Sequence, residues 1–160
     1  AGSTSPPAST QSRSRNSATS TRPTGGNQVK VPQALLEEMI EHSKADSPNE
    51  CCGLIGGTGD DAITIHRMEN TAHSPLRYEM DSKEQLKVYK EILENGHDIV
   101  GIYHSHTRTA AYPSQTDINL ASGWPDAVYF IVSLENPDEP YVRGFNIRDG
   151  QVEDVDIQAV

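Results

Sequence analysis

The sequence predicts an α/β or α+β fold in which helices pack on a mixed β-sheet. Apolar residues recur at spacings of three and four in two segments, as they do on one face of a helix. Short apolar or alternating runs, typical of strands, lie between and after these segments, and turns containing Gly or Asn separate them. Strands interleaved with helices, without an internal repeat, favour a layered domain of sheet and helices.

The first half of the chain is expected to hold one helix and two strands. Pro32 suits the first position of a helix, and Ser47-Pro48-Asn49 breaks the helical pattern. The run after this break is apolar, and the next run alternates, so both are expected to be strands joined by a hairpin. The expected elements are a helix at residues 32–45, strands at 51–55 and 62–68, and a hairpin turn around 57–61.

The second half is expected to hold one long helix and five strands. The helix opens at Asp81 or Ser82 and stops at Asn95-Gly96. The turn Arg148-Asp149-Gly150 joins two alternating, edge-like strands, with Gly where a positive φ is expected. The expected strands lie at residues 78–80, 98–104, 127–134, 141–147 and 152–157.

Residues 1–28 differ in composition from the rest of the chain. Their only apolar residues are Ala1, Ala8 and Ala18, among Ser, Thr, Pro, Gly, Asn and Arg. So few apolar side chains cannot offset the entropy lost when a segment becomes ordered. We therefore predict a flexible tail or linker over residues 1–28 and a single domain over 29–160, which is long enough to bury its own core.

The predicted domain is strongly acidic, because the tail holds three of the 13 Lys and Arg and none of the 23 Asp and Glu, which leaves the domain near −13 with neutral His. Nucleic acid is not an expected partner, since phosphate binding requires the opposite charge. No apolar run approaches the ~18 residues of a membrane span, and no membrane partner is expected. Cys51 and Cys52 are adjacent, which suits a disulfide poorly, so a reducing cytoplasm is the expected location.

Two histidines and an aspartate are the candidate metal ligands. His104 and His106 are two residues apart, so at the end of an extended strand both imidazoles project to the same side. Asp117 can supply a third ligand from the first turn of a helix beyond Pro113. Three protein ligands leave one tetrahedral position for water, whose pKa zinc lowers towards ~7.

Glu50 and Ser114 are the candidate catalytic residues. If the strand after Glu50 pairs with the strand that ends at His104, the Glu50 carboxylate can face the ion and act as the general base. Ser114 could then donate a hydrogen bond to a developing oxyanion. Taken singly, these residues have simpler explanations: Ser114 and Asp117 have the spacing of a capping box, and Glu50 alone would be a surface acid.

The pattern Glu50 … His104-Ser105-His106-x7-Ser114-x2-Asp117 resembles the full signature of the JAMM, or MPN-type, metallopeptidases. The resemblance extends to residues 48–57 and 70–72, and residues 82–89, 103–107 and 111–114 are similar to the small bacterial CysO-cysteine peptidase group. It implies an MPN-like mixed sheet flanked by helices, layered as in cytidine deaminases. It also implies one zinc ion on His104, His106 and Asp117, with Glu50 as general acid and base and Ser114 supporting the oxyanion.

The same resemblance implies a substrate. It is the amide bond after the C-terminal Gly-Gly of a ubiquitin-like or sulfur-carrier protein, with cysteine or a lysine-linked protein as the leaving group. A flexible Gly-Gly tail can lie extended in a narrow groove and add to a sheet edge, and residues 70–80 and 107–112 are expected to border that groove. Gly25-Gly26 could itself be the processed end of a fused ubiquitin-like precursor, or a plain linker.

Two rival functions remain open at this point. One is a non-catalytic MPN-type scaffold that binds partners through the same sheet. The other is a cysteine hydrolase that uses Cys51 or Cys52, with His104 as the base. The sequence also leaves open which carrier protein is cut and whether the chain forms a homodimer.

Overall fold

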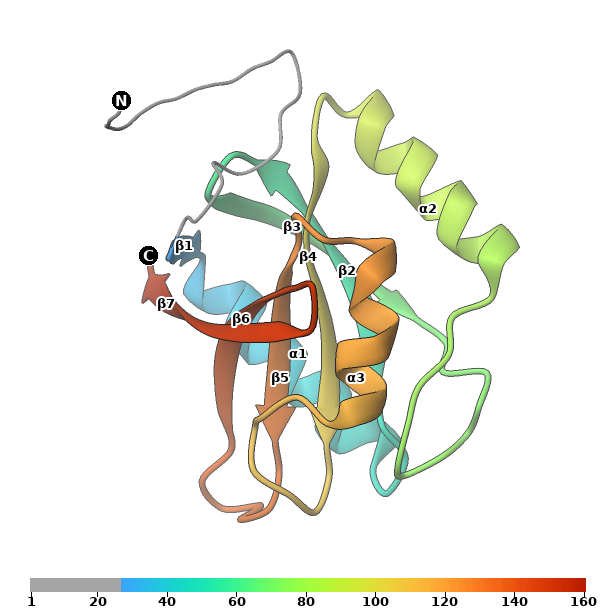
Figure 1. The fold of residues 1–160 in the computed structure, drawn as a ribbon, viewed down its shortest axis with the longest axis vertical. Helices are drawn as coiled ribbons and strands as arrows, with labels where there is room; N and C mark the ends of the chain where they lie inside the picture. Colours follow the sequence, from blue (N-terminus) through green and yellow to red (C-terminus); the bar gives the residue numbers. More distant parts are fainter. Residues whose placement is uncertain (1–26) are drawn as a thin grey trace.

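The computed structural model describes residues 27–160, apart from the side chain of Ser122. Gly25-Gly26 and nearly all of the predicted tail lie outside this part. The first strand begins at Gln28, one residue before the expected start of the domain. The elements, in order, are β1 (Gln28–Val31), α1 (Gln33–Asp46), β2 (Cys52–Thr58), β3 (Asp61–Met68), α2 (Ser82–Glu94), β4 (Asp98–His106), α3 (Gln115–Leu120), the 3-10 helix η2 (Ala121–Gly123), β5 (Val128–Ser133), β6 (Tyr141–Arg148) and β7 (Gln151–Ala159) (Figure 1).

These strands form one mixed sheet in the order β1-β3-β2-β4-β5-β6-β7, and the sheet closes because β1 pairs with β7. The central strand, β4, is antiparallel to β2 and parallel to β5. A mixed sheet with flanking helices confirms the predicted fold class. The expectation that the last two strands are edge strands is wrong, because β6 lies between β5 and β7, and β7 pairs with β1 over Asp156–Ala159.

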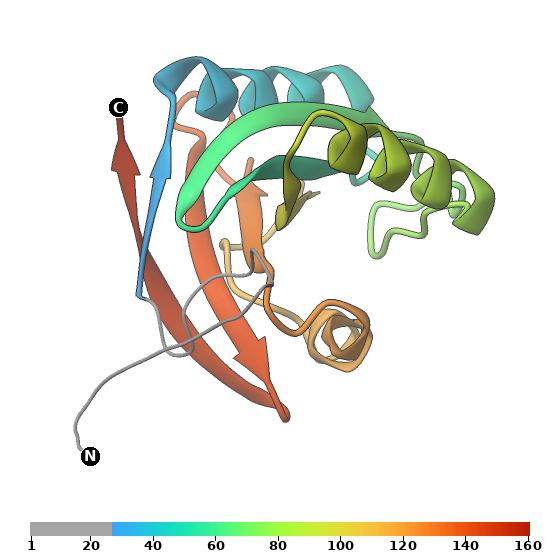
Figure 2. The ribbon, with the colours of Figure 1, turned by 90° about the horizontal axis from the view of Figure 1, so that it is seen from above.

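The helices pack on two separate cores. Met39 of α1 shares one core with Tyr103 and Phe130, whereas Ile92 of α2 shares the other with Ile102. Accordingly, α1 and α2 lie on opposite sides of the β2–β3 hairpin (Figure 2). Within residues 27–160, no helix combines the length and the apolar character needed to span a membrane.

Gly53 of β2 leaves room for the Tyr103 ring on the neighbouring strand β4. A Cβ at Gly53 of β2 would lie 2.2 Å from Cε1 of the fully buried Tyr103 ring on β4. The Tyr103 hydroxyl in turn meets Nδ1 of the buried His42 on α1 at 2.7 Å. Gly53 therefore permits the contact that joins α1 to the central strand.

Both long helices confirm the expected boundaries to within one residue. Pro32 is the residue before α1 rather than its first residue, and Asp81 caps α2 by accepting a hydrogen bond from the Glu84 amide at 3.0 Å. The expected strand at residues 78–80 is wrong. These residues join no ladder, because the Glu79 amide donates to the side-chain oxygen of Asn70 at 3.0 Å instead.

The turn between β6 and β7 confirms the expected backbone conformation. Asp149 and Gly150 both have positive φ, 51° and 76°, the pattern of a two-residue hairpin turn.

The register between β2 and β4 places Glu50 relative to the two histidines. Cys52 lies opposite His104, so Glu50, two residues earlier, lies close to the end of β4 where His106 also stands.

Candidate active site and metal centre

The end of β4 carries the two candidate imidazoles into the interior. His104 and His106 lie on the same face with ring centroids 5.1 Å apart, and both are buried. Ser105 points the other way, and its hydroxyl oxygen accepts a hydrogen bond from the Cys51 amide at 2.8 Å. The alternation of a strand thus places both imidazoles on one side, as expected.

Asp117 reaches the same point from α3. Ser114 caps this helix: its hydroxyl oxygen accepts from the Asp117 amide at 3.1 Å, and Asp117 Oδ2 accepts from the Ser114 amide at 2.9 Å. The capping box proposed as the simpler explanation is therefore confirmed. It does not compete with a ligand role, because the capping bonds hold the same carboxylate against the two imidazoles.

Three donor atoms converge on one point. Asp117 Oδ2 lies 3.1 Å from Nε2 of His104 and 3.1 Å from Nε2 of His106, and the two Nε2 atoms are 3.3 Å apart. Bonds of 2.0–2.1 Å at tetrahedral angles separate the ligand atoms of a zinc ion by about 3.3 Å. The spacing and the donor set of two imidazoles and one carboxylate both fit a zinc ion.

Hydrogen bonding further indicates that a cation belongs between these atoms. His106 Nδ1 lies 3.0 Å from the Ala110 carbonyl oxygen, which requires Nδ1 to carry the proton. In a neutral imidazole Nε2 then presents a lone pair to the Asp117 carboxylate, an arrangement that repels unless a proton or a metal ion lies between them.

The charges of the metal-free site agree with this requirement. Burial lowers the pKa of His106, but hydrogen bonds to Asp117 and Ala110 outweigh it, so the pKa lies above its ordinary value. Burial raises the pKa of Asp117, whereas the adjacent imidazoles hold it well below its usual range. Without a metal, the site favours the ionised Asp117 and holds the His106 proton more tightly than a free imidazole does, so a metal ion competes with that proton.

Glu50 is buried beside the three donors. It is 4% exposed, and its Oε1 has no hydrogen-bond partner among the described residues. Burial raises the pKa of Glu50 to about 8; the charge of His106 lowers it and the charge of Asp117 raises it further. The charges of His106 and Asp117 thus act on the Glu50 carboxyl group, in agreement with its place beside the end of β4. The reading of Glu50 as a surface acid is wrong.

An aromatic contact was not anticipated from the sequence. The buried Tyr78 ring stacks on His104, with centroids 4.7 Å apart and an interplanar angle of 27°. Tyr78 belongs to the loop between β3 and α2, and no spacing in the sequence links that loop to His104. The sequence indicated only that residues 70–80 border the groove, without naming Tyr78.

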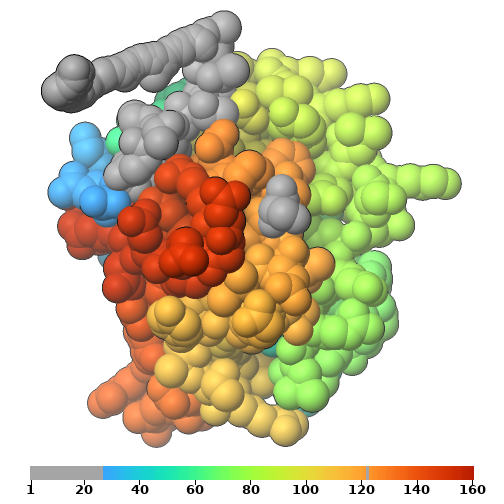
Figure 3. Space-filling model, viewed as in Figure 1, coloured from blue at the N-terminus to red at the C-terminus, as the bar shows by residue number. Residues whose placement is uncertain are grey.

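A cavity adjoins Tyr78, and none of the five candidate site residues lines it. This cavity of about 510 Å³ lies between this loop, α2 and η2, and its lining includes Tyr78, Trp124 and Tyr129. On the surface the green segment around residues 70–80 adjoins the yellow segment after β4 (Figure 3). Both expected bordering segments contact site residues, since Ala110 accepts from His106 and Tyr78 stacks on His104.

The two cysteines do not support a thiol nucleophile. Cys51 and Cys52 are free, fully buried, and lie in different cores. Burial raises the pKa of Cys51 to about 11 and that of Cys52 still higher, so the reactive thiolate is disfavoured at both. The cysteine-hydrolase alternative is therefore wrong.

Comparison with known proteins gives a consistent family. The Prok-JAB family profile, described as prokaryotic homologs of the JAB domain, matches residues 32–147. The CysO-cysteine peptidase of Mycobacterium tuberculosis is 41% identical over 128 residues, covering 79% of this chain and 87% of the relative. A desampylase of Haloferax volcanii is 38% identical over 104 residues, covering 62% of this chain and 73% of the relative.

Solved structures agree on the fold. A Desulfitobacterium hafniense protein superposes with a TM-score of 0.75 at 35% identity, covering 83% of this chain and 93% of that one. A JAB1/MPN domain protein from Archaeoglobus fulgidus superposes with a TM-score of 0.55 at 20% identity, covering 81% and 99%. Relatives that are named peptidases disfavour the non-catalytic scaffold.

Proposed function

Since the chain belongs to the Prok-JAB family of JAB-domain homologues and is a peptidase of the JAMM type, we propose that it is a zinc enzyme that cleaves the amide bond after a C-terminal Gly-Gly. The substrate is a ubiquitin-like or sulfur-carrier protein joined to free cysteine or to a lysine side chain. The observation that carries the proposal is the convergence of three buried donor atoms, 3.1–3.3 Å apart, beside a buried carboxyl group.

Each site residue has a role in this proposal. His104, His106 and Asp117 hold the zinc ion, which supplies Lewis acidity when bound. Glu50 takes a proton from the attacking water and delivers it to the leaving amine. The raised pKa of Glu50 would fall with a divalent cation in the site, and its carboxylate would then be available as a base near neutral pH. The Ser114 hydroxyl accepts from the Asp117 amide, which leaves its own hydrogen free to donate to the oxyanion.

The sheet leaves backbone available for the expected addition of the carrier tail. β1 pairs with β3 only at Asp61, so residues 62–68 of β3 pair with β2 alone among the described strands. The tail lies between the backbones of residues 70–80 and 107–112, which adjoin His104 and His106. Glycines suit this position because they let the scissile carbonyl approach closely.

The relatives' printed names support both leaving groups. The CysO-cysteine peptidase is named for a carrier–cysteine bond, and a Thermus thermophilus relative, 34% identical, is named a probable TtuB-protein conjugate cleaving protease. Free thiols at Cys51 and Cys52 agree with a reducing cytoplasm as the place of action.

If Gly25-Gly26 is a processing site, cleavage occurs between molecules. The strand pairings locate β1 relative to β4. Lys30 of β1 pairs with Asp61, and Asp61 pairs with Thr58. The residue before Thr58 pairs with Asp98, the first residue of β4. The metal centre lies at the other end of β4, about 20 Å away at ~3.3 Å per residue. Because β1 runs parallel to β3, Gln28 lies farther from the centre than Lys30 does.

Mass spectrometry of defined conjugates tests the proposal. Carriers ending in Gly-Gly, extended by cysteine or linked to a lysine, are incubated with the zinc-loaded enzyme, and loss of one extension identifies the leaving group. We expect turnover to stop with a chelator and in Glu50→Gln, while Glu50→Gln keeps its zinc and His106→Ala loses it. Full turnover by Glu50→Gln with normal zinc content would exclude Glu50 as the base.

A further inference from the structure

Asn70 follows β3 and opens the loop that leads to α2. Asn70 is 5% exposed, and every hydrogen-bonding group of its side chain is used. The Nδ2 group donates to the Glu50 carbonyl oxygen at 2.9 Å and to the Arg77 carbonyl oxygen at 3.1 Å. Its Oδ1 accepts from the amides of Ala72 and Glu79, each at 3.0 Å.

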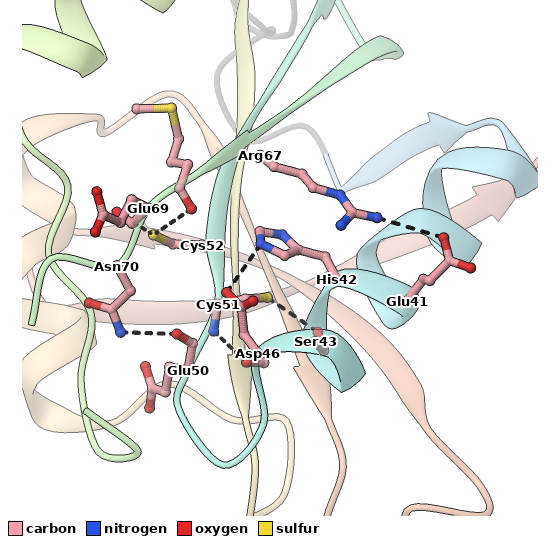
Figure 4. Close-up of polar contacts among 12 residues, drawn as sticks. Glu41, His42, Ser43, Asp46, Glu50, Cys51, Cys52, Arg67, Glu69 and Asn70 are labelled. Atoms are coloured by element: carbon pink, nitrogen blue, oxygen red, sulfur yellow. Dashed lines mark hydrogen bonds and ion pairs between the residues drawn. The ribbon is translucent and has the colours of Figure 1, made fainter. Parts of the chain in front are cut away.

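These bonds hold the peptide of Glu50 on one side. The Glu50 amide donates to the Ser74 carbonyl oxygen at 2.9 Å, so both main-chain groups of Glu50 bind the same loop. The next residue, Cys51, is fixed from the opposite side by Ser105. Figure 4 shows Asn70 reaching the main-chain oxygen of Glu50, with the Glu50 carboxylate extending away from this contact.

Glu50 needs such a support because its carboxylate has no side-chain anchor. Its Oε1 has no hydrogen-bond partner among the described residues, and Glu50 precedes β2 rather than lying in its ladder. The position of the carboxylate therefore depends on the main chain. The same loop carries Tyr78, whose ring stacks on His104, so one segment contacts both the base and a candidate ligand.

We propose that Asn70 is a positioning residue for Glu50: its amide donor fixes the Glu50 peptide, and its oxygen folds the loop that holds it. This inference rests on the proposed role of Glu50 as the base. Asn70 is not itself in contact with the reacting atoms. Its loss displaces the carboxylate from the attacking water, and a displacement near 1 Å is enough to slow catalysis severely.

Asn70→Asp removes the amide donor of the side chain and keeps its acceptor oxygen. The aspartate keeps an oxygen for the Ala72 and Glu79 amides, but it places a second oxygen against the carbonyl oxygens of Glu50 and Arg77. We expect kcat to fall by about tenfold or more, with KM within about twofold and zinc content unchanged. The neutral, smaller Asn70→Ser is made in parallel, so the result does not depend on one variant folding.

Asn136→Asp is the matched control. Asn136 is exposed in the loop between β5 and β6, and its Oδ1 accepts from the Asp138 amide at 3.1 Å. It receives the same substitution outside the segments that border the site, so we expect its kcat to stay within about twofold of the wild type. A loss of kcat equal to that of the Asn70 variants would mean that an added negative charge suffices, and would overturn the specific role of Asn70.

A double-mutant cycle tests whether Asn70 acts through Glu50. In the Glu50→Gln background, residual turnover measured at high enzyme concentration should not fall further when Asn70→Asp is added. Independent, multiplying losses would overturn the proposal, as would a full wild-type kcat in both Asn70 variants.

Amide hydrogen exchange of metal-free protein gives a readout that needs no substrate. The Glu50 amide should exchange about tenfold or more faster in the Asn70 variants, while the amide of Ile131 in the core strand β5 stays unchanged. An unchanged exchange rate of the Glu50 amide would overturn the positioning role of Asn70. If wild-type enzyme cleaves no Gly-Gly conjugate, the proposed function fails, and this measurement still decides the role of Asn70.

Discussion

Burial gives Glu50 a property that its sequence position does not suggest. In the metal-free protein burial raises the pKa of Glu50 to about 8, against 4.5 for the free side chain. Between these values the folded state binds a proton that the unfolded state releases. Stability linked to Glu50 is therefore present at low pH and is lost as the pH rises through this window.

Glu50→Gln should remove this pH dependence. We expect metal-free Glu50→Gln to gain about 2–4 kcal/mol in the free energy of unfolding relative to wild type between pH 5 and pH 8. Urea unfolding at the two pH values measures it, and Glu139→Gln, at an exposed loop position, is the control. A difference between variant and wild type that is equal at both pH values would contradict the pKa shift of Glu50.

The short helix α3 shows how one structural device can serve two purposes. Its six residues are too few to be stable alone, and its first turn depends on the reciprocal bonds between Ser114 and Asp117. The same bonds aim the Asp117 carboxylate at the two imidazoles. The cap and the metal centre are therefore built from one set of contacts.

Replacing Ser114 by Asp or Ala should separate stability from catalysis. Ser114→Asp keeps an N-cap acceptor but has no hydroxyl donor, so we expect wild-type thermal stability with turnover reduced by about 10²-fold or more. Ser114→Ala should lose the same turnover and also about 1 kcal/mol of stability. Thermal unfolding and kcat are measured together; high turnover in Ser114→Asp would exclude an oxyanion role for the hydroxyl.

The metal centre joins α3 to β4, the strand between β2 and β5 in the sheet. His104 and His106 come from the central strand, and Asp117 comes from a helix that lies beyond a loop. An ion that binds these donors only in the folded state must stabilise the whole domain.

Metal removal should therefore lower the melting temperature. At a zinc concentration of about 1,000 times Kd the stabilisation is ~4 kcal/mol, which corresponds to a shift of about 10 °C or more. We expect a chelator to produce this shift in wild type and zinc to reverse it, with no shift in Asp117→Ala. The shift should shrink as the pH falls below the raised pKa of His106, since protons then compete with the metal. An equal chelator effect in Asp117→Ala would place the ion elsewhere.

The sequence by itself determined the helices, most strands and the five candidate site residues. Local rules suffice there: apolar periodicity reports helices, alternation reports strands, and residues two apart on a strand face the same way, as His104 and His106 do. Ser114 and Asp117 carry their cap in four consecutive positions. These features depend on residues that are close together in the sequence, so the sequence alone predicts them.

Only the tertiary structure decided the features that depend on contacts between distant segments. β1 closes the sheet through a pairing between the two ends of the domain, and this overturned the expected edge strands. Asn70 takes the hydrogen bonds that a strand at residues 78–80 would have used. The burial of Glu50, and with it its raised pKa, arises from packing among β2, β4 and the loop before α2, because desolvation depends on which segments exclude water from a group.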